Sequence, residues 1–334
     1  AVNMKAENSI FKVNRGTEKN SYSGNISGND PNYVENTIGM YITPRSNSTT
    51  GTKTIIRNYD IKFGDYAKNS IMFLNDGSSN SYNMINKVFT STLRETYIDN
   101  TAVSSINADA GQNNTIFYNK GEVINSTFAS IPILYIKPDI NIGTAAKAVN
   151  NTLALYNQGG RAHLTGNIET YGEYSHGIYN TDVSRTSGGV LYTVGSMLDN
   201  TIDGVTKSIS IITHGNNSAV LYNSGSNVDF QAGGTFKALG ESGVVLYNKN
   251  GNINIAGGAL LEAENGSAVI VADGGNIKLG AGNTYNVRNN SVFAYVSGNP
   301  GIKAEFSGAG QTLNLESGST GFVYDGDSTN MQQN

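Results

Sequence analysis

The chain has 334 residues, with 40 Gly, no Cys, 14% charged residues and a net charge of −4. The charged fraction lies well below the roughly 25% of an ordinary domain and disfavours long helices, and the missing Cys excludes disulfides, thiolate metal sites and cysteine nucleophiles. The slightly acidic balance provides no basic field for nucleic acid or anionic lipid, so we expect no nucleic-acid partner.

The first 110 residues show no regular period. Residues 14–66 mix tyrosines with Asn, Ser and Gly, a composition that suits adaptable binding surfaces. We therefore expect part of a binding surface here, carried by Tyr22, Tyr33, Tyr59 and Tyr66. Residues 1–110 are interpreted as an irregular N-terminal part of the fold with loop insertions.

A short apolar phrase recurs through the rest of the chain. It usually ends in Asn or Asp, and its copies are Met72–Asn75, Ile116–Asn119, Leu153–Asn157, Gly177–Asn180, Gly189–Tyr192, Val220–Asn223, Val245–Asn248, Ile270–Asp273, Ala294–Ser297 and Phe322–Asp325. From residue 220 to 297 the spacing is 24 or 25 residues. A fixed period of this length indicates a stacked-repeat architecture.

Each regular repeat contains two further apolar alternations. After Val220–Asn223 come Val228 with Phe230, and then Phe236 with Ala238, separated by Gly and Asn turns. Three short strands per repeat are typical of one coil of a parallel β-helix. We predict an all-β, right-handed parallel β-helix of about 24–25 residues per coil, because crossover connections are overwhelmingly right-handed.

The period also predicts dimensions and a polar ladder. Coils stacked at the strand spacing of about 4.8 Å give some 12 to 14 coils and a rod of roughly 60 Å. The Asn or Asp that ends each phrase falls at one turn and can hydrogen-bond its counterparts above and below. We expect a structural turn ladder of Asn223, Asn248, Asp273 and Asp325.

The longest apolar departure from the period lies between Asn119 and Asn157. The regular β-helix is expected over 111–334, with an insertion near 125–145 that contains the apolar stretch Ile131–Pro138. Insertions in a solenoid emerge as loops, and loops carry recognition. This stretch is either an exposed hydrophobic handle or an extra strand packed on the rod; the first alternative predicts a binding site at Pro132, Leu134, Tyr135 and Lys137.

An enzymatic alternative rests on three residues. Asn180-Thr181-Asp182 resembles a signature of polygalacturonase-like hydrolases, and Thr213-His214-Gly215 resembles their Gly-His-Gly, but the adjacent Asp-Asp pair is missing. An inverting hydrolase needs two carboxyl groups about 6.5–9.5 Å apart. Asp182 and Asp203, with His214, meet that requirement only if they share one face of neighbouring coils. Otherwise all three are ordinary turn residues, and we expect no enzyme.

No cofactor or metal is expected. The three histidines lack the spacing of a zinc site. The segment Asp325–Asn330 has oxygen ligands at alternate positions but lacks the Glu that completes a calcium loop.

The recurring Val-Leu-Tyr-Asn phrases, the run Asn252–Gly258 and the absence of Cys together resemble the passenger region of autotransporters, the type V secreted proteins of Gram-negative bacteria, and most of all the large fusobacterial-type adhesins. The resemblance implies a virulence-associated rod on the cell surface, anchored to the outer membrane by a C-terminal β-barrel that lies outside this chain. It implies adhesion to a host receptor, a glycan or other bacterial cells. A structural or self-associating stalk and a polysaccharide hydrolase or lyase remain the alternatives.

Overall fold

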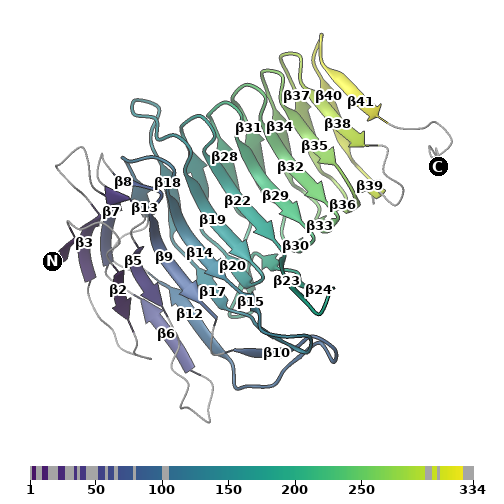
Figure 1. The fold of residues 1–334 in the computed structure, drawn as a ribbon. Helices are drawn as coiled ribbons and strands as arrows, with labels where there is room; N and C mark the ends of the chain where they lie inside the picture. The colour runs from purple at the N-terminus through teal and green to yellow at the C-terminus, as the bar shows by residue number, and fades with distance from the viewer. Residues whose placement is uncertain are drawn as a thin grey trace.

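The computed structural model is an all-β solenoid, and Figure 1 shows its strands stacked along one long axis. It describes residues 67–77, 80–99, 105–297 and 309–325, together with strands β1 to β7 and β39, whose bounds follow. No helix occurs in these described residues. Most strands belong to three parallel sheets of eleven, nine and eight members.

Each large sheet collects strands from successive coils. The 11-stranded sheet consists of β2 (Ile10–Val13), β5 (Ile38–Ile42), β9 (Ile71–Asp76), β14 (Thr115–Lys120), β19 (Leu153–Gln158), β22 (His176–Thr181), β29 (Ala219–Ser224), β32 (Val244–Lys249), β35 (Ala268–Ala272), β38 (Val292–Ser297) and β41 (Thr320–Asp325). The 9-stranded sheet consists of β6 (Thr52–Ile56), β12 (Arg94–Ile98), β17 (Ile133–Ile136), β20 (Arg161–Leu164), β25 (Met197–Asp199), β30 (Asn227–Phe230), β33 (Gly251–Ile255), β36 (Gly275–Leu279) and β39 (Lys303–Phe306). The 8-stranded sheet consists of β13 (Ser105–Ala108), β18 (Asp139–Ile142), β21 (Ile168–Thr170), β28 (Ser210–Thr213), β31 (Thr235–Ala238), β34 (Leu260–Ala263), β37 (Thr284–Val287) and β40 (Thr312–Leu315). Near the N-terminus, β1 (Val2–Met4), β3 (Tyr22–Ile26) and β7 (Tyr59–Phe63) form a small parallel sheet, and β4 (Val34–Glu35) pairs with β8 (Ala67–Lys68).

One coil runs through all three large sheets. The chain passes from β29 to β30 to β31 and then enters β32, which pairs in parallel with β29. The pairing advances from Asn223 to Asn248, which is 25 residues, and from Asn248 to Ala272, which is 24. The predicted parallel β-helix with three strands and 24–25 residues per regular coil is therefore confirmed.

The number of coils is smaller than the 12 to 14 expected. The longest sheet has 11 strands, so the described chain makes about that many turns. Part of the difference lies in long segments inserted into three of the coils. The irregular spacing between residues 75 and 223 has the same cause.

The core is a set of stacked columns inside the coils. One column of the 11-stranded sheet has no exposed surface on most of its members and consists of Phe73, Phe117, Leu155, Ile178, Leu221, Leu246, Ile270 and Ala294. Phe73 and Phe117 stack with ring centroids 4.9 Å apart. Each apolar side chain thus packs on its equivalents in the neighbouring coils, which is why the phrase recurs in the sequence.

An asparagine ladder lies beside that column. Its members are fully or almost fully buried: Asn75, Asn119, Asn157, Asn180, Asn223 and Asn248. Each Nδ2 donates to the Oδ1 of the next asparagine at 2.7–2.9 Å. The predicted bond between Asn223 and Asn248 is present, but the ladder occupies buried strand positions, not exposed turns.

The two acidic residues expected in this ladder lie outside it. The 24-residue step places Ala272 opposite Asn248, so Asp273 falls one position beyond β35 and accepts a hydrogen bond from Ser297 Oγ at 2.9 Å. Asp325 pairs in register with Ser297 and accepts from the Tyr295 hydroxyl at 2.6 Å. A one-residue shift in coil length therefore moved both carboxylates to the exterior.

The stretch Ile131–Pro138 is not an exposed handle. Its centre is β17, a regular member of the 9-stranded sheet, between β12 and β20. Leu134 and Ile136 belong to the main core, with at most 1% of their surface exposed. The stretch is therefore a strand, as the second alternative of the sequence analysis had it, but it is a regular strand of its coil and not an extra one.

Candidate functional site

Three inserted segments leave the rod at the same corner of the coil. In regular coils the connection from the 11-stranded to the 9-stranded sheet is one or two residues long, as at 250, 159–160 and 225–226. Among the connections that the structure describes, three are long, at 77–93, 121–132 and 182–196. We call the described residues of these three connections, 77, 80–93, 121–132 and 182–196, the lateral extension.

The first two connections build a small sheet. Its strands, in the order β11-β10-β16-β15, are β11 (Val88–Phe89), β10 (Ser81–Asn83), β16 (Phe128–Ser130) and β15 (Glu122–Val123), and every pair is antiparallel. The small sheet thus joins two coils, because β10 and β16 pair with each other and come from consecutive turns of the rod. Figure 1 shows β10 lying outside the stacked strands.

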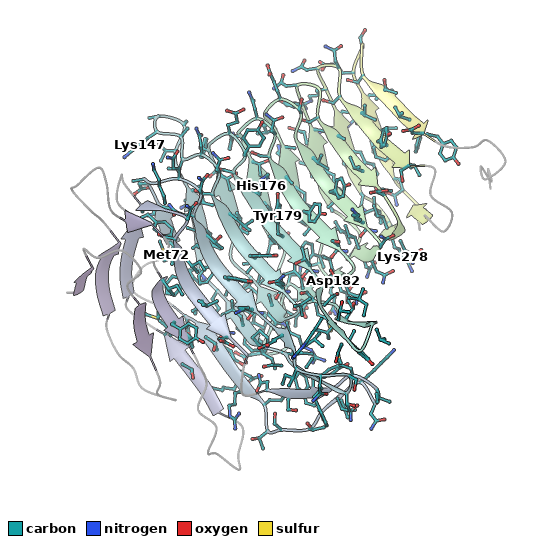
Figure 2. All side chains as sticks on the ribbon, viewed as in Figure 1. Met72, Lys147, His176, Tyr179, Asp182 and Lys278 are labelled. Carbon is teal, nitrogen blue, oxygen red and sulfur yellow. The ribbon has the colours of Figure 1, made fainter. Side chains whose placement is uncertain are left out.

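The third connection is a hairpin. β23 (Val183–Ser187) and β24 (Val190–Val194) pair antiparallel through the two-residue turn Gly188–Gly189. Both glycines have positive φ, 59° and 78°, as the tight turns that fit strand twist require. Figure 1 shows this hairpin projecting from the side of the rod, and Figure 2 marks its base at Asp182.

A second hydrophobic core holds the extension together. Val123, Ala129, Ile131 and Val194 are buried in it, and Tyr82, Met84, Phe89, Val183 and Tyr192 pack against it. The Arg161 guanidinium of β20 lies 4.6 Å from the centre of the Phe89 ring, which joins the extension to the rod. The Arg185 guanidinium of the hairpin donates a hydrogen bond to the Ile124 carbonyl. The extension is therefore a folded layer with its own core.

The extension carries much of the exposed apolar surface. Of the twelve large hydrophobic side chains that are exposed in the described residues, six lie on it: Ile85, Val88, Leu93, Ile124, Val190 and Leu191. Its acidic and basic side chains are only Lys87, Glu122, Asp182 and Arg185. Exposed apolar side chains gathered on one extension with few charges make it a candidate interaction site.

Tyr135 and Lys137, predicted as binding residues, belong to a different surface. Tyr135 stacks between Tyr97 and His163 on the outside of the 9-stranded sheet, with ring centroids 4.2 and 4.4 Å apart. Burial and the hydrogen bond to Glu95 raise the pKa of Tyr135 strongly. Lys137 Nζ lies 3.5 Å from Asp99. These groups satisfy one another.

The remaining predicted binding residues of this stretch lie inside the fold, and a hairpin covers the Tyr135 stack. Pro132 and Leu134, the other two predicted binding residues of this stretch, are buried. A second hairpin, β26 (Thr201–Ile202) with β27 (Val205–Thr206), carries Asp203 over the stack, where Asp203 accepts from the Tyr97 hydroxyl at 3.2 Å.

The candidate catalytic residues lie at three different corners of one coil. Asp182 follows β22, and burial raises the pKa of its carboxyl group. Asp203 follows β25 and lies 3.6 Å from Lys53 Nζ. His214 follows β28; its Nε2 lies 2.9 Å from Glu169 and its ring stacks on Tyr171. The arrangement joins none of them into an acid–base pair.

The N-terminal tyrosines are only partly described. Tyr22 and Tyr59 face each other in register in the backbones of β3 and β7. Tyr33 and Tyr66 lie outside the described residues.

Neither a metal cluster nor a membrane-spanning helix is found in the part of the chain that the structure describes. Comparison with protein-family models, curated proteins and solved structures gives no match to this chain.

Sequence reasoning missed the extension as a unit. Gly188–Gly189 between two β-rich runs is a hairpin signal and locates the third segment. The association of 80–93 with 121–132 has no local signal, because it depends on which coils stack next to each other.

Proposed function

We propose that this chain is a segment of a cell-surface adhesin, a rod that presents the lateral extension to a binding partner. The observation that carries the proposal is the concentration of half of the exposed large hydrophobic side chains on three co-localised insertions. Surface-apolar patches of this kind are costly for a solitary protein and are expected at interaction sites.

The outer faces of the rod support the proposal that the rod is a shaft and the lateral extension is the binding surface. On the outside of the 9-stranded sheet, Asn227, Asn252 and Asn276 form an exposed ladder with amide hydrogen bonds of 2.8 and 2.9 Å. On the 8-stranded sheet Glu262 binds Lys237 and Asn286. Polar side chains that hydrogen-bond to one another along the rod suit a shaft. The extension instead exposes apolar side chains to solvent.

The chemistry of the extension favours a protein partner over a glycan. Its exposed side chains are aliphatic, and its few charges include both signs. Sugar recognition draws on directed hydrogen bonds and open aromatic faces, whereas three of the four rings here, Tyr82, Phe89 and Tyr192, pack on the extension's own core and the fourth, Phe128, is half-buried. A host receptor or a surface protein of another cell fits this surface best.

Cell-surface placement and the autotransporter class rest on the repeat phrases, the Asn-rich composition and the absence of Cys. A parallel β-helix built from local, coil-by-coil contacts can fold progressively after export, because each coil packs only on its neighbours. This supports the class as part of the same proposal.

The test replaces residues 182–196 with Gly-Ser, the two-residue connection found at 225–226. We expect a saturable signal of the purified chain on an array of extracellular receptor domains and glycans, and its loss in the shortened variant, with the β-rich circular dichroism spectrum retained. Asn252→Ser on the polar face is the matched control and should bind normally. Binding that survives the replacement, or no binding by the intact chain, would contradict the proposal.

A further inference from the structure

The outer strand of the projecting hairpin has an unprotected edge. Among the described residues, β23 and β24 pair only with each other, so each has one side whose backbone groups join no sheet. Natural sheet edges are normally blunted by Lys, Pro, a bulge or very short length. β24 has the sequence Val190-Leu191-Tyr192-Thr193-Val194, which contains none of these devices.

Two other short edge strands outside the main sheets are protected. β11 is two residues long and directly follows Lys87, and β27 is two residues long and precedes Lys207. β24 has five residues with high strand propensity. Its side chains Val190 and Leu191 are 51% and 65% exposed. β24 therefore combines an edge that lacks these devices with exposed apolar side chains.

The sequence of β24 is complementary to itself in an antiparallel arrangement. With Tyr192 opposite Tyr192 of a second copy, Val190 faces Val194 and Leu191 faces Thr193, so every pair joins residues that favour strands. The only acidic or basic residue in 183–194 is Arg185, which lies on β23 and already binds the Ile124 carbonyl. No like charges meet across the new pair.

We propose that β24 pairs with β24 of a second copy of this chain around a twofold axis at Tyr192, giving the four-stranded intermolecular sheet β23-β24-β24-β23. The inference rests on the proposed role of the lateral extension as the binding surface, and it names a second copy as the partner. A twofold interface requires a patch that is complementary to itself, and β24 meets that requirement. On a cell surface such pairing would join rods of the same kind.

The first test is the mass of the purified chain in solution across a wide concentration range, by sedimentation equilibrium. We expect a concentration-dependent dimer, and we expect Leu191→Lys to be monomeric over the same range because a charge on an edge strand opposes pairing. Val205→Lys, at an exposed apolar position of the other hairpin, is the matched control and should dimerise like the parent. A monomeric parent chain, or a dimer that Leu191→Lys leaves intact, overturns the proposal.

The second test reads the register by disulfide trapping, which is clean because the chain has no Cys. Opposed residues in antiparallel strands have Cα atoms about 4.5 or 5.5 Å apart, within the range that a disulfide spans. Tyr192→Cys should therefore form covalent dimers on oxidation. Leu191→Cys mixed with Thr193→Cys should form covalent heterodimers, whereas neither of these two alone should cross-link. Cross-linking of Leu191→Cys alone, or none in the mixture, overturns the register.

The two proposals fail separately. If the chain is monomeric and still binds an array protein through residues 182–196, the adhesin proposal stands and pairing with a second copy is wrong, since the hairpin then accepts a foreign partner. If the chain dimerises as described but binds no array target, the pairing stands and the heterotypic adhesin proposal is wrong.

Discussion

At the residue scale, the asparagine ladder favours one register in the coils from β9 to β32. Each amide both donates and accepts, so six buried side chains form one directional chain of bonds, which ends where Thr96 Oγ1 donates to Asn75 Oδ1 at 2.8 Å. Buried polar groups cost stability unless they are paired. A strand that slipped by one residue would break its two ladder bonds at once, so the ladder selects a single register.

Replacing a central member of the ladder should destabilise the rod. Asn180→Ala removes the bonds to Asn157 at 2.7 Å and to Asn223 at 2.8 Å. We expect a loss of about 3 kcal/mol in the free energy of unfolding, because buried partners are left unsatisfied. Asn252→Ala, in the exposed ladder, should cost less than about 1 kcal/mol, because water replaces its partners. Chemical denaturation followed by circular dichroism measures both, and equal effects would refute the role of burial.

His176 should make stability fall in mild acid. Burial lowers the pKa of His176 from 6.5 to about 4, and its Nδ1 accepts a hydrogen bond from the Ala219 amide, which requires the neutral ring. The unfolded chain therefore binds more protons than the folded one between these two values, so this contribution to stability is complete above pH 6.5 and is lost as pH falls toward 4.

Proton NMR on the three histidines measures this directly. The signal that disappears in His176→Gln should titrate near pH 4, and the same variant should show a weaker drop in unfolding free energy from pH 7 to pH 5 than the parent. A midpoint near 6.5 would contradict the buried, neutral imidazole.

At the element scale, the same tripeptide has two fates. Val-Leu-Tyr occurs at 190–192, 220–222 and 245–247, but only the last two form coil strands. After the tripeptide, Asn223 and Asn248 extend the buried amide ladder, whereas Thr193 has no amide side chain. The amide is not required of every coil strand, since Ala272 and Val296 occupy its position in β35 and β38. Gly188–Gly189 then offers a tight turn, and the antiparallel hairpin results. The Asn residues and the Gly-Gly turn are both visible in the sequence. Their different roles can be recognised only once the asparagine ladder is known to lie inside the coils.

The strand that was predicted as a handle should behave as core. Leu134→Ala is expected to lower the free energy of unfolding by about 2–5 kcal/mol, because it leaves a cavity inside the stacked coils. Leu191→Ala, on the exposed hairpin, should change it by no more than about 0.5 kcal/mol. Thermal and chemical unfolding of the two variants compare them directly. A stable Leu134→Ala that lost binding would restore the handle interpretation.

At the scale of the whole molecule, the regular coils were predictable and the lateral layer was not. The 24- and 25-residue steps from Val220 onward follow from local apolar alternation. The sequence alone therefore predicts that each repeat contains three strands and forms one coil of the solenoid. The extension depends on contacts between coils, such as β10 with β16, whose residues are 47 positions apart at Tyr82 and Ala129. Such pairings follow from the stacking order and leave no periodic signal.

The stacked architecture also predicts graded stability along the axis. A solenoid coil contacts only its neighbours, so an interior coil is held on two sides and a terminal one on a single side. Among the described residues, β40 and β41 are the last strands of their sheets. Their side chains Leu313, Leu315 and Phe322 are 41%, 46% and 64% exposed, although they continue the columns of the buried Tyr285, Val287 and Ala294.

Hydrogen exchange read by mass spectrometry should therefore show slow exchange for β29 to β35 and fast exchange for β40 and β41 in this chain, since local opening follows the amount of buried contact. Asn180→Ala should speed exchange in β19, β22 and β29, which share its ladder bonds, more than in β37. Protection of β41 equal to that of β32 would contradict nearest-neighbour stacking, because it would mean that the rod opens as one cooperative unit. In that case an insertion at any corner would change the stability of every coil.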